Sequence, residues 1–180
     1  MFALKEEYLP KYDKSDYETW EGNWELISGI PFAMAPAPGW YHQELNWKIC
    51  AHIQNALNGC KNCKVNMPVN WLISPNTIVQ PDVVVVCKPF EEGIYLKKTP
   101  EIIFEILSQS TSDRDVGLKY ELYQNNGVKY YVIVHPIEKF VEIFTLGPDN
   151  QYSSAGRISL ENFHFDISGC SFDMEFGEIW

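Results

Sequence analysis

The feature that most constrains the fold is a run of four valines, Val83–Val86, which directly follows Asp82. A strand that is apolar at consecutive positions has to be covered on both faces, so this run predicts a central strand. Residues 101–107 form a second such segment, which is apolar except for Glu101 and Glu105. Two strands of this kind predict an α/β fold with a central mixed sheet flanked by helices.

Two helices are predicted to pack on this sheet. The first spans about 41–58 and is closed by Gly59, and its apolar stripe at a spacing of four is Leu45, Ile49, Ile53 and Leu57. The second spans about 113–125, and its expected buried stripe is Val116, Tyr120 and Tyr123. It would join the strands at 101–107 and 130–135 in a βαβ unit, right-handed if the two strands are parallel.

An N-terminal β-hairpin is predicted from 23–27 and 30–35, because Gly29 supplies the positive φ that a tight turn needs. Pro31 places the second of these strands near a sheet edge. Further strands are expected at 65–73, 77–87 and 140–146.

A chain of 180 residues is expected to form one domain, with an arm at 1–20, a core at 20–146 and a tail at 147–180. The tail is expected to add one strand and a short final helix. No apolar run approaches the roughly 18 residues of a membrane span, and the N-terminus lacks the apolar segment of a signal peptide. A cytoplasmic protein without membrane contact is the expectation.

The chain carries 14 basic and 24 acidic residues, a formal charge of −10. This balance argues against a general nucleic-acid coat protein, because lysine and arginine hold a polyanion. It is compatible with an enzyme that touches phosphate at one local site.

The five cysteines lie at positions 50, 60, 63, 87 and 170. An odd number in a chain without a secretion signal predicts reduced thiols and no disulfide framework. Cys60 and Cys63 have the spacing of half a zinc site, but Cys87 and Cys170 are solitary, so no second pair is evident. A surface turn is favoured over a zinc site, for which Cys60 and Cys63 plus His52 are the conceivable ligands.

Acidic residues inside apolar strands are the strongest chemical signal. Asp82 opens the valine strand and Glu105 lies in the middle of the next, and a buried carboxylate needs a cation, a hydrogen-bond network or a metal. Two neighbouring carboxylates suit a hard divalent ion such as Mg²⁺. The alternative is that Glu105 forms a core ion pair with Lys119 or Arg114. From spacing alone both interpretations stay open.

Several motifs together resemble the Uma-type family, in the PD-(D/E)XK superfamily of restriction-endonuclease-like nucleases. The more specific ones are 80–86, which begins Gln80-Pro81-Asp82, and 104–108, which contains Glu105. Other matching positions are 24–29, 42–43, 110–111, Asp115, Lys119, Tyr123 and 127–131. The resemblance covers about residues 20–146 and implies a restriction-endonuclease-like fold.

By this resemblance, Asp82 and Glu105 would bind the metal, and the backbone carbonyl of Ile106 would add a ligand. Mg²⁺ is the implied cofactor, with Mn²⁺ as a substitute. The superfamily usually places a lysine two residues after the glutamate, where this chain has Leu107. The family moves that lysine to the following helix, and Lys119 is the matching position.

The implied reaction is hydrolysis of DNA phosphodiester bonds, and a homodimer would suit cleavage of both strands. Glu25 is a candidate third acid if its hairpin folds over the site, and His42 and Gln80 are candidate substrate-binding or auxiliary residues. Leu107 and the acidic charge motivate an alternative, a catalytically lapsed nuclease-fold binding or assembly module. A small-molecule phosphodiesterase is a further alternative.

Overall fold

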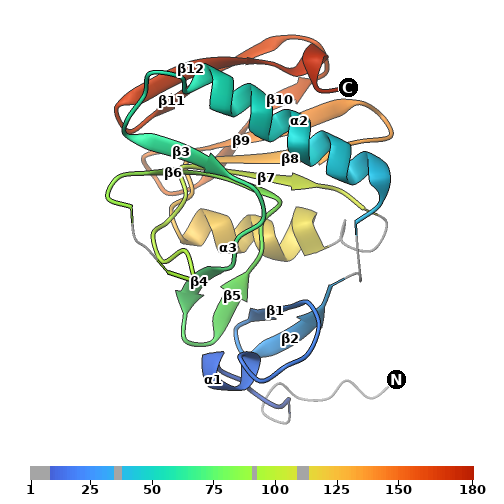
Figure 1. Ribbon diagram of the computed structural model, residues 1–180, viewed down its shortest axis with the longest axis vertical. Helices are drawn as coiled ribbons and strands as arrows, with labels where there is room; N and C mark the ends of the chain where they lie inside the picture. Colours follow the sequence, from blue (N-terminus) through green and yellow to red (C-terminus); the bar gives the residue numbers. More distant parts are fainter. Residues whose placement is uncertain (1–8, 35–37, 91–92, 109–113) are drawn as a thin grey trace.

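The computed structural model describes residues 9–34, 38–90, 93–108 and 114–180, apart from the side chains of residues 114 and 115. Figure 1 shows a central sheet with one long helix above it, a shorter helix below it, and a smaller sheet beyond the shorter helix. The helices are α1 (Lys14–Tyr17), α2 (Trp40–Ala56), the π-helix η2 (Arg114–Leu118), α3 (Lys119–Asn125) and the 3₁₀ helix η3 (Phe176–Glu178).

The strands fall into three sheets in the described part of the chain. The central sheet has the order β10-β9-β8-β7-β6-β3, the smaller sheet β2-β1-β5-β4, and β11 pairs with β12. Their bounds are β1 (Trp24–Ile27), β2 (Ile30–Ala33), β3 (Cys63–Asn66), β4 (Trp71–Ser74), β5 (Thr77–Val79), β6 (Val83–Cys87), β7 (Ile102–Ile106), β8 (Tyr130–His135), β9 (Phe140–Leu146), β10 (Tyr152–Ile158), β11 (Asn162–Ile167) and β12 (Cys170–Glu175).

The central sheet is mixed, as predicted. Strand β7 is parallel to β8, and the other neighbouring pairs are antiparallel. The expected unit of β7, a helix and β8 is therefore confirmed as a parallel crossover.

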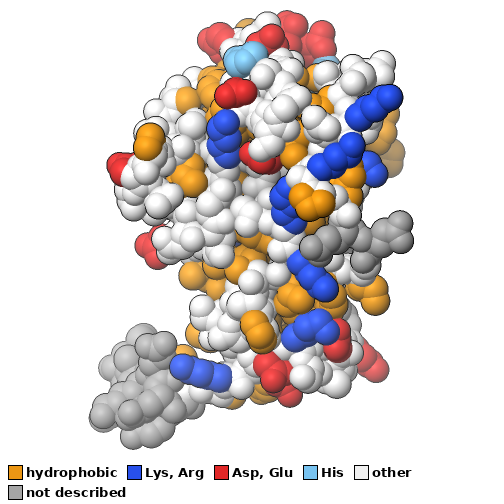
Figure 2. All heavy atoms as spheres, turned by 90° about the vertical axis from the view of Figure 1, so that its left-hand side faces the viewer, with side chains coloured by type: hydrophobic (Ala, Val, Ile, Leu, Met, Phe, Trp, Pro, Cys, Tyr) orange, Lys and Arg blue, Asp and Glu red, His pale blue; other side chains and the backbone are white. Residues whose placement is uncertain are grey.

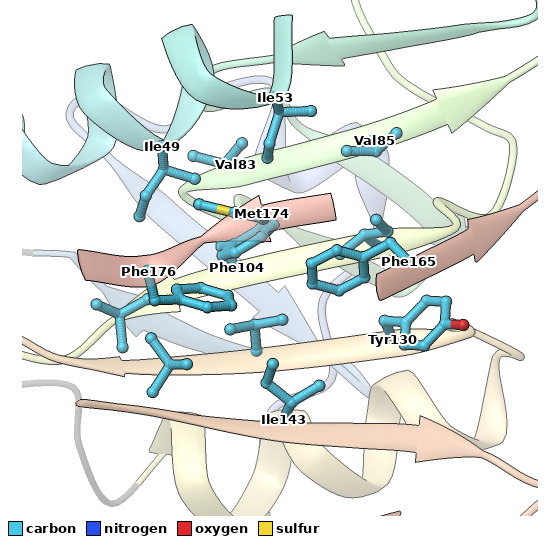
Figure 3. Close-up of a cluster of buried hydrophobic side chains, with 14 of the residues drawn as sticks. Ile49, Ile53, Val83, Val85, Phe104, Tyr130, Ile143, Phe165, Met174 and Phe176 are labelled. Atoms are coloured by element: carbon cyan, nitrogen blue, oxygen red, sulfur yellow. The ribbon is translucent and has the colours of Figure 1, made fainter. Parts of the chain in front are cut away.

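The valine strand is covered on both faces. Val83 and Val85 of β6 belong to the core that faces α2, whereas Val84 and Val86 belong to the core that contains Tyr123 of α3. Figure 3 shows the first core, where side chains of α2 meet the sheet and the aromatic side chains of the tail. The predicted stripe of α2 is fully inside it: Leu45, Ile49, Ile53 and Leu57.

The crossover helix differs from the prediction in its first half. Residues 114–118 form a π-helix, and only Lys119–Asn125 is α-helical. Because a π-helix has more residues per turn, it shifts the buried face away from Val116, which is 48% exposed. Tyr123 is buried as expected. The predicted start at residue 113 lies outside the described residues.

Two predicted strands are each divided into two. The segment 77–87 splits into β5 in the smaller sheet and β6 in the central sheet, and 65–73 splits into β3 and β4. Pro81 and Pro68 lie in the interruptions, and proline cannot donate to a strand ladder. Residues 80–82 therefore connect the two sheets, which places Asp82 at their junction.

The N-terminal hairpin is confirmed, and Ser28 and Gly29 both have positive φ, of 53° and 82°. Strand β2 is at the edge of its sheet, as Pro31 indicated. Strand β1 also pairs with β5 through Leu26 and Ile78. This pairing holds the hairpin beside the chain that enters β6.

The tail forms three strands and a 3₁₀ helix, more than the single strand and short helix expected. Strand β10 extends the central sheet, and the hairpin of β11 and β12 lies next to α2 (Figure 1). Phe165 and Phe176 are completely buried in the core that faces α2. The described residues contain no helix long and apolar enough to cross a membrane.

The expectation of separate reduced thiols was wrong. The structure joins Cys60 to Cys170 and Cys63 to Cys87 by disulfide bonds, and leaves Cys50 free. The chain separations of 110 and 24 residues gave no sign of this proximity. The tail brings Cys170 to Cys60, and the pairing of β3 with β6 places Cys63 opposite Cys87.

Candidate functional site

A buried lysine joins two buried carboxylates. The Nζ atom of Lys119 lies 2.9 Å from Oε1 of Glu105 and 2.9 Å from Oε1 of Glu25. The three side chains are at most 4% exposed. Lys119 therefore reaches Glu105, and Glu25 lies in the same cluster, as a hairpin folded over the site would require.

Three separate elements bring these side chains together. Glu105 lies in the centrally placed strand β7 and alternates with the core residues Phe104 and Ile106, so its side chain points to the face covered by α3. Lys119 opens α3 on that face. Glu25 comes from β1, and its Oε1 atom also accepts a hydrogen bond of 2.9 Å from the backbone N–H of Gln80.

Tyr123 completes this cluster. Its hydroxyl donates a 2.6 Å hydrogen bond to Oε1 of Glu105, one helical turn after Lys119. Burial, and next the charge of Glu105, raise the pKa of Tyr123 well above its ordinary value, so it stays protonated and remains a donor. From sequence we expected Tyr123 as a core residue and as a position that matches the family, but gave it no role in the site; its i+4 spacing from Lys119 was the available signal.

Replacing Tyr123 with Phe is expected to lower the free energy of unfolding by about 1.5–3 kcal/mol, because the lost hydrogen bond has a charged acceptor. Urea denaturation measures the change. Tyr152→Phe is the matched control, since its buried hydroxyl donates a 2.9 Å bond to the neutral carbonyl of Val128. An equal or smaller loss for Tyr123→Phe than for this control would contradict the prediction.

Asp82 and His42 form a second group around the next residue of β7. Oδ2 of Asp82 accepts a 2.8 Å hydrogen bond from the backbone N–H of Ile106. Nε2 of His42 lies 3.1 Å from the carbonyl oxygen of Ile106 and 3.3 Å from Oδ2 of Asp82. Both oxygens only accept hydrogen bonds, so Nε2 carries the hydrogen.

The two groups adjoin through consecutive residues of one strand. Glu105 belongs to the first group, and Ile106 to the second. Asp82 also continues the antiparallel register in which Val83 is opposite Phe104, which places it opposite Glu105. The structure thus brings together Asp82, Glu105, Ile106, Lys119, Glu25 and His42.

Gln80 contributes only its backbone to this cluster. Its side-chain amide donates a 3.2 Å bond to Asn70 instead, beside a surface pocket that Trp20 and Trp24 help to line. We did not expect Asn46, which follows His42 by one turn of α2. It is 1% exposed, and its amide nitrogen and oxygen have no hydrogen-bond partner among the described residues. It adds a polar group to the helix face that carries His42.

The described side chains of the site carry excess negative charge. Three carboxylates, from Asp82, Glu105 and Glu25, face one ammonium, from Lys119, which leaves two negative charges when His42 is neutral. The carbonyl oxygen of Ile106 is a further hard donor at the same place. An all-oxygen donor set with this charge fits a hard divalent cation.

A family model described as "Putative restriction endonuclease" matches residues 9–163. The chain belongs to the Uma2 family. The match includes every candidate site residue named above, whereas β12 lies beyond it.

Among solved structures, the chain is similar to a protein of Anabaena variabilis described as a "putative nuclease belonging to DUF820". The two share 13% identity with a TM-score of 0.75, over 93% of this chain and 97% of the other. The predicted restriction-endonuclease-like fold is thereby confirmed. No curated protein matches the sequence.

Proposed function

We propose that this Uma2 protein is a metal-dependent endonuclease that hydrolyses DNA phosphodiester bonds in the cytoplasm. The observation that carries the proposal is the ammonium of Lys119, held 2.9 Å from both Glu25 and Glu105. Asp82 follows opposite Glu105 in the strand register. A nuclease of the restriction-endonuclease type needs acidic metal ligands next to a cation, and this cluster supplies both. The family and the fold are those of restriction-endonuclease-like nucleases.

Asp82, Glu105 and the carbonyl oxygen of Ile106 would hold Mg²⁺, or Mn²⁺ in its place. The side chain of Asp82 is 19% exposed, so this end of the donor set is open to solvent. Bound there, the ion would lower the pKa of a water molecule and screen the charge that develops on the phosphoryl group.

Other side chains of the site would have the remaining roles in the proposed hydrolysis. Lys119 orients the attacking water or stabilises negative charge on the phosphoryl oxygens. Glu25 and Tyr123 fix the positions of Lys119 and Glu105, because each shares a contact with one of them. His42 lies near the open side with Asp82, where it can contact substrate or supply a proton.

The same cluster permits the alternative of a lapsed nuclease-fold module for binding or assembly. The usual lysine position of the superfamily holds Leu107, and Lys119 is fully engaged by two carboxylates, as in a structural ion-pair network. We favour the enzyme because the two excess negative charges give a divalent ion a place. In that function we propose one domain and a homodimer, whose two-fold symmetry suits a duplex.

A calorimetric titration with Mn²⁺ tests the proposal without a guess about the DNA sequence. Wild type is expected to bind the ion, and Asp82→Asn to bind about 100-fold more weakly or not at all, because it removes a charged ligand. Asp149→Asn is the control, since Asp149 is exposed in the turn between β9 and β10 and is not a residue of the candidate site. Wild type that binds no Mn²⁺, alone or with duplex DNA, would support the lapsed module.

A further inference from the structure

Four of the five cysteines converge at one end of the molecule. The sulfur atoms of Cys60, Cys63 and Cys170 all lie within 4.8 Å of one another. Cys87 is adjacent to this group of three through Cys63, to which it is bonded and directly opposite in the register of β3 and β6. The sequence suggested half a zinc site; the fold supplies the two solitary cysteines that could complete it.

These cysteines come from four different segments. Cys60 follows α2, Cys63 opens β3, Cys87 closes β6, and Cys170 opens β12. In Figure 1 the turn between β11 and β12 lies beside the end of α2, at the left. Asp82 precedes the other end of β6, so the cysteine cluster is separate from the candidate active site.

The two turns that carry Cys60 and Cys170 approach closely. A Cβ atom at Gly169 would lie 2.9 Å from the side-chain nitrogen of Asn62, and Gly169 has a φ of 78°. Both the space and the backbone conformation therefore favour glycine next to Cys170. This close approach of the two turns places the sulfur of Cys170 next to that of Cys60.

We propose that, in the reduced chain, Cys60, Cys63, Cys87 and Cys170 bind one Zn²⁺ as thiolates. Tetrahedral zinc with bonds of about 2.3 Å to sulfur places its ligands about 3.8 Å apart, and the sulfurs of Cys60, Cys63 and Cys170 already lie within 4.8 Å of one another. Once reduced, Cys87 can approach the same ion from its position opposite Cys63. The two-residue spacing between Cys60 and Cys63 is the usual one for a zinc-binding pair. The disulfide-bonded arrangement is then the oxidised state of the same cluster.

The groups around these cysteines favour the thiolate form of their side chains. The backbone N–H of Asn62 points at the sulfur of Cys60 at 3.4 Å, and such a donor stabilises a thiolate. A zinc ion with four thiolates carries two negative charges, and Lys61, Lys64 and Lys88 are exposed on the same segments. Figure 2 shows the side of the molecule that is at the left in Figure 1, where lysine and arginine side chains run down the right-hand part of the view.

The reaction balances with a thiol reductant. Each disulfide accepts two electrons and two protons from the reductant and becomes two thiols, and zinc then displaces the four thiol protons. The cytoplasm proposed above would supply that reductant. The zinc site does not depend on nuclease activity.

Zinc bound here would fasten the tail to the family domain. Cys170 lies outside the residues that the family model matches, whereas the other three cysteines lie inside them. The site would therefore hold the hairpin of β11 and β12 against α2 and the edge strand β3 of the central sheet.

The test uses the full chain, untagged, purified with a thiol reductant and dialysed against EDTA-free buffer. Atomic emission is expected to find about one zinc per chain, released by a mercurial thiol reagent. After removal of zinc under reducing conditions, added Co²⁺ should give the intense charge-transfer and d–d bands of a tetrahedral thiolate site. Cys63→Ser and Cys170→Ser should each weaken zinc binding at least about 10-fold.

Cys50→Ser is the matched control, because burial raises the pKa of the Cys50 thiol to about 11 and Cys50 lies outside the cluster. It should retain zinc and the cobalt spectrum, as should Asp82→Asn. In case Cys63→Ser fails to fold, the partly buried Cys170 gives the second variant. A reduced wild type with only trace zinc and no cobalt band would overturn the proposal, and so would two disulfides that survive the reductant.

Discussion

Replacing Lys119 with Met is expected to lower the free energy of unfolding by about 3–5 kcal/mol. Met matches the length of the lysine stem but removes the ammonium that lies 2.9 Å from both Glu25 and Glu105. Two carboxylates, each at most 4% exposed, would then face each other without their shared cation. Removing one partner of a buried ion pair is costly because the other charge stays buried.

Urea denaturation of the two proteins measures this loss, with the exposed Lys97→Met as the control. Adding Glu25→Gln to Lys119→Met is expected to recover part of the stability, since it removes one of the two repelling charges. If Lys119→Met costs no more than Lys97→Met, the cluster does not hold the lysine as a charged bridge.

The central sheet was predictable because its signal is local and redundant. The valine run needs cover on both faces whatever surrounds it, and Val83 and Val84 indeed face different cores. The strand breaks at Pro68 and Pro81 were missed because residues typical of strands occur within a few positions on both sides of each proline. Where such a strand ends depends on which residues pair with the smaller sheet and which pair with the central sheet.

The tail shows a second limit of sequence interpretation. Residues 162–167 alternate between exposed and buried positions, which is the period of a strand, yet the tail was expected to form one strand and a helix. The π-helical turn before Lys119 was also missed, because nothing in the residue pattern separates it from an α-helix. Its effect is visible at Val116, which the helical period had assigned to the core.

The sequence predicted which residues form the candidate site but left open which of them are in contact. Asp82 and Glu105 stand out as acids in apolar strands. Whether Lys119 reaches Glu105 depends on how α3 packs on the sheet, and the place of Glu25 depends on the pairing of β1 with β5. Both are long-range contacts, so a pattern of neighbouring residues cannot fix them. The proximity of the cysteines is also a long-range contact, so it could not be predicted from neighbouring residues either.

Replacing Glu105 with Gln is expected to reduce metal-dependent DNA cleavage by about 1000-fold or more, if the proposed function holds. Gln has nearly the same shape and can still accept the hydrogen bond from Tyr123. Lys119 keeps its ion pair with Glu25, so no buried charge loses every partner. The fold should therefore survive, and the loss can be assigned to the missing metal ligand.

Nicking of supercoiled plasmid with Mn²⁺ or Mg²⁺ measures the rate, and EDTA should stop it. Glu138→Gln is the matched control, because Glu138 is exposed in the turn between β8 and β9. Equal cleavage by wild type and Glu105→Gln would mean that the activity comes from elsewhere, either a contaminant or another part of the chain. Wild type that binds Mn²⁺ through Asp82 yet cleaves no DNA would separate metal binding from catalysis, because a carboxylate site can retain its ion after the lysine beside it has become purely structural.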